Sequence, residues 1–343
     1  MKIDFNNSRS IIGKHMLADG MSPIIDLEKS HGSWLVDGQT RKEYLDLFSM
    51  YASMSVGYNH PYLLKNIDRI SKAAINKPAN SDIYSPQMAT FVDTVSSLAQ
   101  PSYLPYSFFI EGGALAVENA LKTAFDWKAR KNIAAGIDTI PTKVIHLKDC
   151  FHGRTGYTMS LTDSPDIRKT KYFPKFNWPR ITNPSITFPL NEQNIENLIK
   201  KENQSIEEIK KFLFKSSDEI ACLIIEPIQG EGGDNHFRHE YFIELKKLSL
   251  ENDFLLIYDE VQTGIGITGK MWAHQYFEPK SNKEKDTNCK KIEPDIICFG
   301  KKTQVCGIFA GNRLDEVDKH VFKESSRINS TFGVNLTDMV RFT

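Results

Sequence analysis

The 343-residue sequence lacks several features that mark particular classes of protein. It has no excess charge of either sign, because 43 basic residues balance 43 acidic ones, and so no electrostatic reason to bind nucleic acid or an anionic membrane. It has no apolar run of membrane-spanning length and no apolar segment typical of a secretory signal in residues 1–15. Internal repeats and low-complexity tracts are also absent. We therefore predict a soluble, cytoplasmic globular protein.

The cysteines are odd in number and form no C-x-x-C pair, which favours reduced thiols over a disulfide framework. His236 and His239 form an H-x-x-H pattern, but no cysteine or acidic cluster accompanies them at the spacing of a metal site. We interpret both as surface histidines and predict no bound metal. The cysteines are Cys150, Cys222, Cys289, Cys298 and Cys306.

Short apolar runs alternate with amphipathic segments through most of the chain, which predicts an α/β fold with a largely parallel sheet. Residues 24–48 form an exception, because short apolar runs around Asp37-Gly38 indicate a small β unit with a hairpin turn. Residues 173–184 are rich in aromatics and proline and predict an irregular loop. Residues 278–293 are charged and without periodicity, which predicts a solvated loop.

The most informative stretch is residues 254–269. Its apolar run, Phe254–Tyr258, leads directly into Asp259 and Glu260, as a buried parallel strand does where it ends in a site. A second predicted strand, Asp295–Phe299, is followed by Gly300 and then Lys301. Since ligands bind at the carboxyl edge of open α/β sheets, we expect the aspartate and the lysine to meet there.

An aspartate beside a lysine suits pyridoxal phosphate, which needs a lysine amine to form a Schiff base and an acid to keep its pyridine nitrogen protonated. In the alternative interpretation, Asp259 caps a turn and Lys301 is solvated. A third interpretation is a P-loop ATPase, because Gly264–Lys270 nearly matches G-x-x-x-x-G-K-[ST]. Met271 then stands where the Mg²⁺-binding hydroxyl should be, which argues against the ATPase.

Glycines follow another predicted strand, Ser107–Ile110, and precede a helix predicted over Ala114–Lys131. The positive end of the helix dipole would then carry the free N–H groups of Gly112, Gly113 and Ala114. These groups could hold a phosphate. The two glycines could equally serve only a tight turn. Within the helix, Glu118 and Lys122 are spaced for an i,i+4 ion pair.

Two further strands end in polar residues. Lys143–Leu147 precedes Phe151-His152-Gly153-Arg154, in which an aromatic ring and a histidine could flank a flat cofactor and the arginine could bind a carboxylate. A core phenylalanine with a surface arginine is the alternative. Ile220–Ile225 precedes Glu226 and a glycine-rich loop that contains Glu231, which points to the same edge of the sheet.

Six motifs in this order resemble the class III pyridoxal-phosphate aminotransferases of fold type I. The resemblance extends from about His15 to Arg341, and within the family it is greatest to the L-lysine 6-aminotransferase branch. The motifs are FIEGGALAVENALK, FHGRTGYT, IIEPIQGEGGD, DEVQTG, FGKKTQVCG and RINSTFG.

The resemblance implies that Lys301 binds the cofactor covalently and shuttles the proton, and that Asp259 pairs with the pyridinium. Thr331 would contact the phosphate from the neighbouring subunit, so the site would need a homodimer. The implied cofactor-binding residues are Gly112, Gly113, Ala114, Phe151, His152, Asp259, Val261, Gln262, Lys301, Ser330 and Thr331. The implied substrate-binding residues are Arg154, Glu231, Gln262 and Asn329.

The implied reaction moves the ε-amino group of L-lysine to 2-oxoglutarate by a ping-pong mechanism, giving L-glutamate and 2-aminoadipate 6-semialdehyde. Two alternatives remain. The chain could be another ω-aminotransferase, of the ornithine or 4-aminobutyrate type, or a homologue that binds without catalysis.

The family continues beyond the position of Thr343 into a C-terminal small domain, where the arginine that should pair with Glu231 lies. We therefore expect the chain to be truncated and to lack that domain. The expected organisation is a small-domain segment and linker in residues 1–60, the large cofactor-binding domain in 61–320, and the start of the connection to the missing domain in 321–343.

Overall fold

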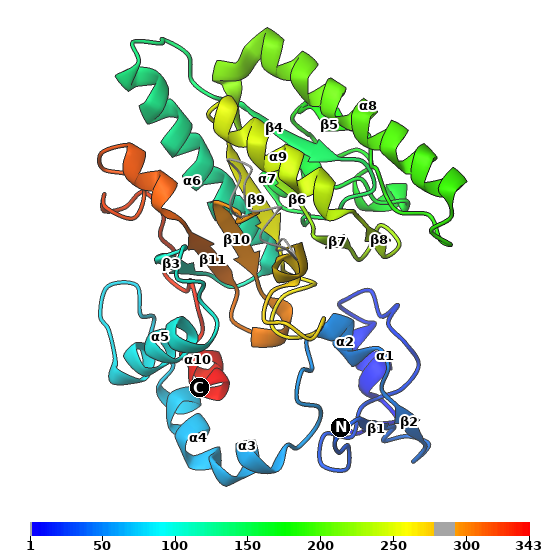
Figure 1. The fold of residues 1–343 in the computed structure, drawn as a ribbon. Coiled ribbons are helices and arrows are strands. Elements are labelled where there is room, and N and C mark those ends of the chain that lie inside the picture. Colours follow the sequence, from blue (N-terminus) through cyan, green and yellow to red (C-terminus); the bar gives the residue numbers. More distant parts are fainter. Residues whose placement is uncertain (1, 278–291) are drawn as a thin grey trace. The chain divides into compact units, whose positions relative to one another are not determined.

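The computed structural model describes residues 2–277 and 292–343 (Figure 1). The predicted charged loop over 278–293 therefore lies almost wholly outside the described residues. The chain divides into two compact units, residues 1–77 and 78–343. All residues of the candidate site belong to the second unit, and the expected domain boundaries stay a prediction.

The first unit contains the predicted hairpin. Strands β1 and β2 pair antiparallel, with Trp34 opposite Leu45. The buried Asp37 begins the turn between them, where its carboxylate accepts hydrogen bonds from the N–H groups of Ile24 (3.1 Å) and Gln39 (3.2 Å). The elements of this unit are β1 Trp34–Val36, β2 Glu43–Leu45, α1 Ser8–Ile12, α2 Ser49–Ala52, α3 Pro61–Lys65 and α4 Ile67–Asn76.

The second unit is built on a seven-stranded sheet in the order β3-β11-β10-β9-β6-β4-β5. Strands β10, β9, β6, β4 and β5 run parallel, and β11 pairs antiparallel with β10 and β3. The predicted, mostly parallel α/β sheet is therefore confirmed. The strands are β3 Tyr106–Phe109, β4 Lys143–Leu147, β5 Arg180–Ile181, β6 Ile220–Ile225, β9 Leu255–Asp259, β10 Ile296–Phe299 and β11 Gly307–Ala310, with a separate ribbon of β7 Ile228–Gln229 and β8 Asn235–His236.

The prediction of an irregular loop over residues 173–184 is wrong in part, because Arg180–Ile181 forms the edge strand β5. The N–H of Lys148 donates to the carbonyl of Ile181 at 2.9 Å, and Ile181 is fully buried. Two residues are too few to show the alternation of apolar and polar side chains that identifies a strand. The surrounding prolines and aromatics therefore decided the prediction in favour of a loop.

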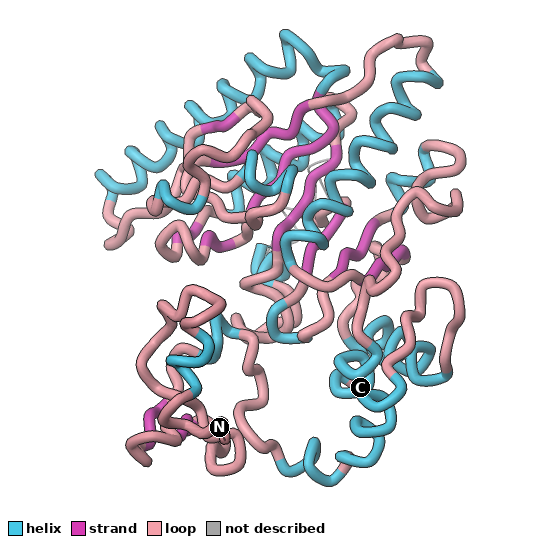
Figure 2. Tube along the Cα trace, turned by 180° about the vertical axis from the view of Figure 1, so that it is seen from behind, coloured by secondary structure: helices cyan, strands magenta, loops and turns pink. Residues whose placement is uncertain are grey.

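Helices cover both faces of this sheet (Figures 1 and 2). Leu255 and Ile257 of β9 pack in one cluster with α6, whereas Leu256 and Tyr258 pack in another with α8 and α9, so alternate residues of a single strand serve two cores. The α-helices are α5 Pro86–Leu98, α6 Gly113–Ala134, α7 Gly156–Leu161, α8 Glu192–Ser216, α9 His239–Glu251 and α10 Leu336–Phe342; 3₁₀ turns occupy Ile167–Lys169, Ser217–Glu219, Ala273–Phe277, Lys301–Thr303 and Asn312–Glu316.

None of the helices in residues 2–277 and 292–343 combines the length and the apolarity that a membrane crossing requires.

A buried ionic cluster anchors the start of β10. The carboxylate of Asp295 accepts from Lys246 Nζ at 2.7 Å, from Arg313 Nη1 at 3.0 Å and from the N–H of Leu256 at 2.7 Å. Burial acts to raise the pKa of Asp295, but the two cations hold it below its ordinary value. The cluster joins α9, β9 and β10 at the edge of the sheet opposite the candidate site.

We predict that Asp295→Ala destabilises the protein by about 3–5 kcal/mol, because it leaves the buried Lys246 without its anion and removes one acidic partner of Arg313. Chemical denaturation at neutral pH measures this, with the exposed Asp138→Ala as the matched control. Equal effects of the two substitutions would contradict the assigned role of the cluster.

Candidate active site

The carboxyl ends of three adjacent parallel strands deliver polar side chains to one place. Asp259 ends β9, Lys301 follows β10, and Glu226 follows β6. The register sets Cys298 beside Asp259 and Ile225 beside Tyr258, so the three strands end nearly level. A cavity of about 420 Å³ opens there, lined by Gly113, Ala114, Phe151, His152, Gly153, Arg154, Thr155, Glu226, Glu231, Asp259, Val261, Gln262 and Lys301. The predicted meeting of Asp259 and Lys301 is therefore confirmed.

Asp259 is held rigidly at the base of the cavity. Its Oδ2 accepts from Nδ1 of His152 at 2.8 Å, and its Oδ1 accepts from the N–H of Val261 at 3.1 Å. Burial opposes protonation of His152, but Cys150 and the Asp259 carboxylate together outweigh it and raise the pKa of the imidazole well above its ordinary value. His152 Nε2 has no hydrogen-bond partner among the described residues. The Asp259 carboxylate is thereby fixed at the cavity, where it can accept a hydrogen bond.

Lys301 occupies a left-handed backbone position, with φ of 52°, directly after the strand and Gly300. Its amine contacts Oε1 of Gln262. Burial lowers the pKa of Lys301, although the charges of Asp259 and Glu226 act to raise it. A lowered pKa increases the fraction of neutral amine, the form that attacks a carbonyl carbon.

Lys302, the other lysine of the pair, points elsewhere. Its Nζ donates to the carbonyl of Gln262 at 2.6 Å, and it is not among the residues that line the cavity. Burial, with the neighbouring Lys301, lowers the pKa of Lys302 to about 8. The geometry therefore favours Lys301 as the reactive amine, as the motif predicted.

Helix α6 begins at the wall of the cavity. Gly112 is its N-cap, has φ of 97° and provides no side-chain cap, and Gly113 and Ala114 line the cavity while Gly112 does not. A Cβ at Gly113 would lie 2.9 Å from Val261 Cγ1, and a Cβ at Gly153 would lie 2.5 Å from the Ala114 side chain. The glycines thus allow three segments to approach closely, and the first N–H groups of the helix are left for an anion.

Glu118 has a role that the sequence did not reveal. The predicted ion pair with Lys122 is wrong. The buried Glu118 carboxylate instead accepts from the hydroxyl of Thr155 at 2.5 Å and from the N–H of Tyr157 at 2.7 Å. It thereby caps α7 from outside, together with the capping box of Thr155 and Thr158. This contact fixes the backbone that follows Arg154.

Glu226 also lines the cavity, at the edge of the sheet to which the sequence pointed, although the family resemblance implied no role for it. Its carboxylate accepts from the N–H of Phe151 at 2.9 Å and from the N–H of Gly230 at 3.3 Å. Burial raises the pKa of Glu226 to about 7, against the opposing effect of His152. The available signal was its position at the end of a buried strand, the same position that identified Asp259.

The mouth of the cavity carries opposite charges. Arg154 is exposed, lines the cavity, and makes no ion pair within the part of the chain that is described. Glu231 accepts from Ser164 Oγ at 2.7 Å and is paired with Lys169. Lys169 was missed in the sequence because 62 residues separate it from its partner.

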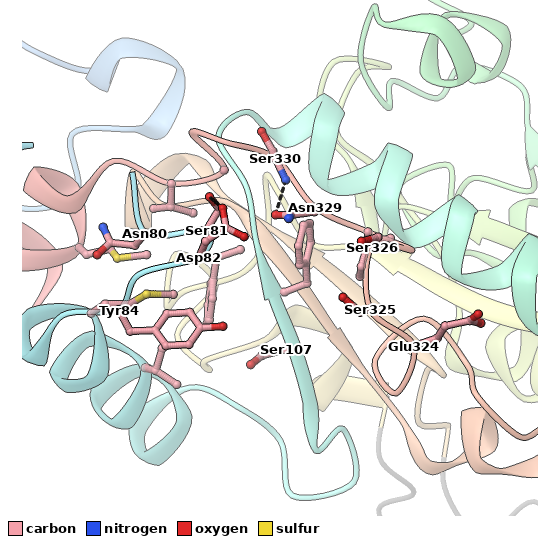
Figure 3. Close-up of a pocket in the computed structure, with 18 residues that line it drawn as sticks. Asn80, Ser81, Asp82, Tyr84, Ser107, Glu324, Ser325, Ser326, Asn329 and Ser330 are labelled. Carbon is pink, nitrogen blue, oxygen red and sulfur yellow. Dashed lines mark hydrogen bonds between the residues drawn. The ribbon is translucent and has the colours of Figure 1, made fainter. Parts of the chain in front are cut away.

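The predicted residues Asn329 and Ser330 lie elsewhere in this chain. They line a second cavity of about 520 Å³, where the side chain of Asn329 accepts from the N–H of Ser330 at 2.7 Å (Figure 3). Thr331 is exposed beside them. Their assigned contacts with cofactor and substrate stay predictions, and for Thr331 the expected contact is with a neighbouring subunit.

The lining residues fit pyridoxal phosphate. Asp259 can accept from a protonated ring nitrogen, the amine of Lys301 can bond to an aldehyde, and the start of α6 can hold a phosphate. Phe151 and Val261 line the same cavity and offer apolar contact to a flat ring. One cavity therefore contains the amine of Lys301, the carboxylate of Asp259 and the N–H groups that can bind an anion.

We predict that Glu226→Gln alters the pH dependence of stability. The pKa of Glu226 is raised from 4.5 to about 7, so its contribution to stability is present below about pH 4.5 and is lost as pH rises through 7. Between pH 5 and pH 8 the free energy of unfolding of the variant should therefore gain about 2–3 kcal/mol relative to the unmodified chain. Denaturant titrations of the cofactor-free protein measure this, and the exposed Glu196→Gln should show no such trend. A pH-independent difference for Glu226→Gln would count against its buried titration.

Comparison with known proteins agrees with this site. The family model described as aminotransferase class-III matches residues 16–341. The L-lysine-epsilon aminotransferase of Mycobacterium tuberculosis is 49% identical over 96% of this chain and 71% of its own length, and that of Streptomyces clavuligerus is 47% identical over 96% and 70%. A solved structure, the M. tuberculosis lysine aminotransferase in the internal aldimine form, has a TM-score of 0.92 at 47% identity and covers 99% of this chain and 75% of that one. The chain therefore belongs to the class-III aminotransferases.

Proposed function

We propose that this chain is a pyridoxal-phosphate-dependent L-lysine 6-aminotransferase. It transfers the ε-amino group of L-lysine to 2-oxoglutarate and yields L-glutamate and 2-aminoadipate 6-semialdehyde. The observation that carries the proposal is the cavity that joins Lys301, Asp259 and Arg154, in a chain that is 49% identical to an L-lysine-epsilon aminotransferase over almost all its length.

Pyridoxal phosphate, when bound, supplies an aldehyde that accepts amino groups and a ring that stores the electron pair released from the substrate carbon. Asp259 keeps the ring nitrogen protonated, because its carboxylate is buried and held by His152 and by the N–H of Val261. Phe151 and Val261 would contact the ring, and the N–H groups at the start of α6 would hold the phosphate.

Lys301 has two tasks in this scheme. Its amine would hold the cofactor between reactions, which its lowered pKa favours. When it is free, the same amine would take up and give back the proton of the substrate carbon. Gln262, which contacts the Lys301 amine, limits the positions that this amine can adopt.

Arg154 binds the substrate carboxylate. Its guanidinium is exposed at the mouth and makes no ion pair with the described residues, so it is available for a bidentate contact. A carboxylate bound there leaves the far end of the substrate to reach Lys301. This arrangement also suits ornithine and 4-aminobutyrate, which remain the alternative donors.

The proposed active form is a cytoplasmic homodimer with shared sites. The exposed position of Thr331 supports it, because this is the residue expected to contact the neighbouring subunit. The four described cysteines are unpaired, which agrees with a reducing compartment.

We predict that Lys301→Ala abolishes the visible absorption band of the lysine-bound cofactor and lowers transamination by at least about 10³-fold, since the nucleophile and the proton carrier are both lost. Lys302→Met should retain the band, because Lys302 faces away from the cavity. Absorption spectra before and after addition of L-lysine measure both. A band that survives in Lys301→Ala would refute the assignment.

We also predict that Arg154→Gln raises KM for L-lysine about 10- to 100-fold, the loss expected for a charged hydrogen-bonded contact. Arg168→Gln is the control, because that guanidinium is exposed and already bonded to Asp166. Comparison of kcat/KM for L-lysine, ornithine and 4-aminobutyrate tests the donor. If the protein prefers ornithine or 4-aminobutyrate, that compound replaces L-lysine as the proposed amino donor.

A further inference from the structure

The loop that follows β4 and carries His152 is tied back onto itself. It leads into the short helix α7, and the residues at the end of α7 return to the start of the loop. The N–H of Asp163 donates to the carbonyl of Cys150 at 2.8 Å, and the thiol of Cys150 donates to the carbonyl of Leu161 at 3.2 Å. Residues 150–163 therefore form a segment whose two ends are hydrogen-bonded to each other.

Thr162 makes the central connection within this segment. It directly follows α7 and is 2% exposed. Its hydroxyl accepts from the N–H of His152 at 3.1 Å and donates to the carbonyl of Gly153 at 2.7 Å, so a single oxygen pairs two backbone groups of buried residues. Serine could make the same two hydrogen bonds, whereas valine has the shape of threonine but no hydroxyl.

The backbone that Thr162 holds belongs to the residue that contacts Asp259. Nδ1 of His152 lies 2.8 Å from Oδ2 of Asp259, and the two side chains are 0% and 5% exposed. The other ring nitrogen, Nε2, has no hydrogen-bond partner within residues 2–277 and 292–343, so hydrogen bonds hold the ring at one nitrogen only. The position of the His152 backbone therefore decides how the imidazole meets the carboxylate.

We propose that Thr162 is a positioning residue, which holds the His152 imidazole against Asp259 and so keeps the carboxylate in place for the protonated ring nitrogen of pyridoxal phosphate. This role rests on the proposed function and adds a residue to it. Loss of the hydroxyl would leave the N–H of His152 and the carbonyl of Gly153 unpaired in a buried place, so the backbone would shift to pair them. The bond between His152 and Asp259 would then lengthen, and a buried carboxylate with fewer hydrogen bonds is less stable as an anion.

Proton magnetic resonance tests the contact without any reaction. A buried ring N–H that is bonded to a carboxylate gives a resonance far downfield, and its loss in His152→Gln identifies the one that belongs to His152. Thr162→Val should remove or broaden this resonance, and Thr162→Ser should retain it. Thr162→Ala is read in the same way if Thr162→Val does not fold.

The control is Thr123→Val, because Thr123 is similarly buried but its hydroxyl donates to the carbonyl of Asn119 within its own helix at 2.8 Å. This variant should leave the His152 resonance unchanged. An unchanged resonance in Thr162→Val, or its loss in Thr162→Ser, would overturn the proposal.

Pyridoxal phosphate labelled with nitrogen-15 in its ring provides the second measurement, because the chemical shift reports whether the ring nitrogen is protonated. The unmodified protein, Thr162→Ser and Thr123→Val should all show the protonated nitrogen. Thr162→Val should move the signal toward the unprotonated form and bind the cofactor roughly tenfold more weakly.

A double-mutant cycle separates positioning from a general loss of structure. In protein that already carries His152→Gln, Thr162→Val should change cofactor affinity by less than about twofold, because the residue through which Thr162 acts is gone. Equal losses with and without His152→Gln would overturn the proposal. If pyridoxal phosphate does not bind the unmodified protein, the proposed function fails, and the His152 resonance still decides whether Thr162 positions the imidazole.

Discussion

The parallel pairing of β9 with β10 is the constraint on which the site depends. Because Cys298 lies beside Asp259 in this pairing, Lys301 emerges from the sheet only three residues later, at the same edge. A shift of one residue would exchange the two faces of β9 and bury Asp259 in a different environment. The ionic cluster around Asp295 fixes the opposite end of β10. The pairing register is therefore held at the end of the strand that is farther from the candidate site.

Much of this could be predicted from local patterns. Apolar runs that end in Asp259, or are followed by Lys301, identify strands and the edge at which they end, and the structure confirms both. Contacts between distant side chains left no such signal. Glu118 reaches Thr155 and not Lys122, and Lys169 reaches Glu231, because tertiary packing and not sequence spacing selects these partners.

Some assignments depend on more than one chain. Thr331 is exposed in this chain and does not line the cavity of Lys301, and its predicted contact is with the cofactor of a neighbouring subunit. A sequence motif is the signal that identifies such a residue, because its predicted partner lies on another chain.

The close approach of Gly153 to Ala114 links two parts of the site mechanically. A Cβ at Gly153 would lie 2.5 Å from the Ala114 side chain, so the loop that carries Phe151 and Arg154 touches the first turn of α6. Displacement of that loop would move the start of the helix with it. Efforts to widen the range of amino donors by rebuilding this loop would therefore also disturb how firmly the protein retains its cofactor.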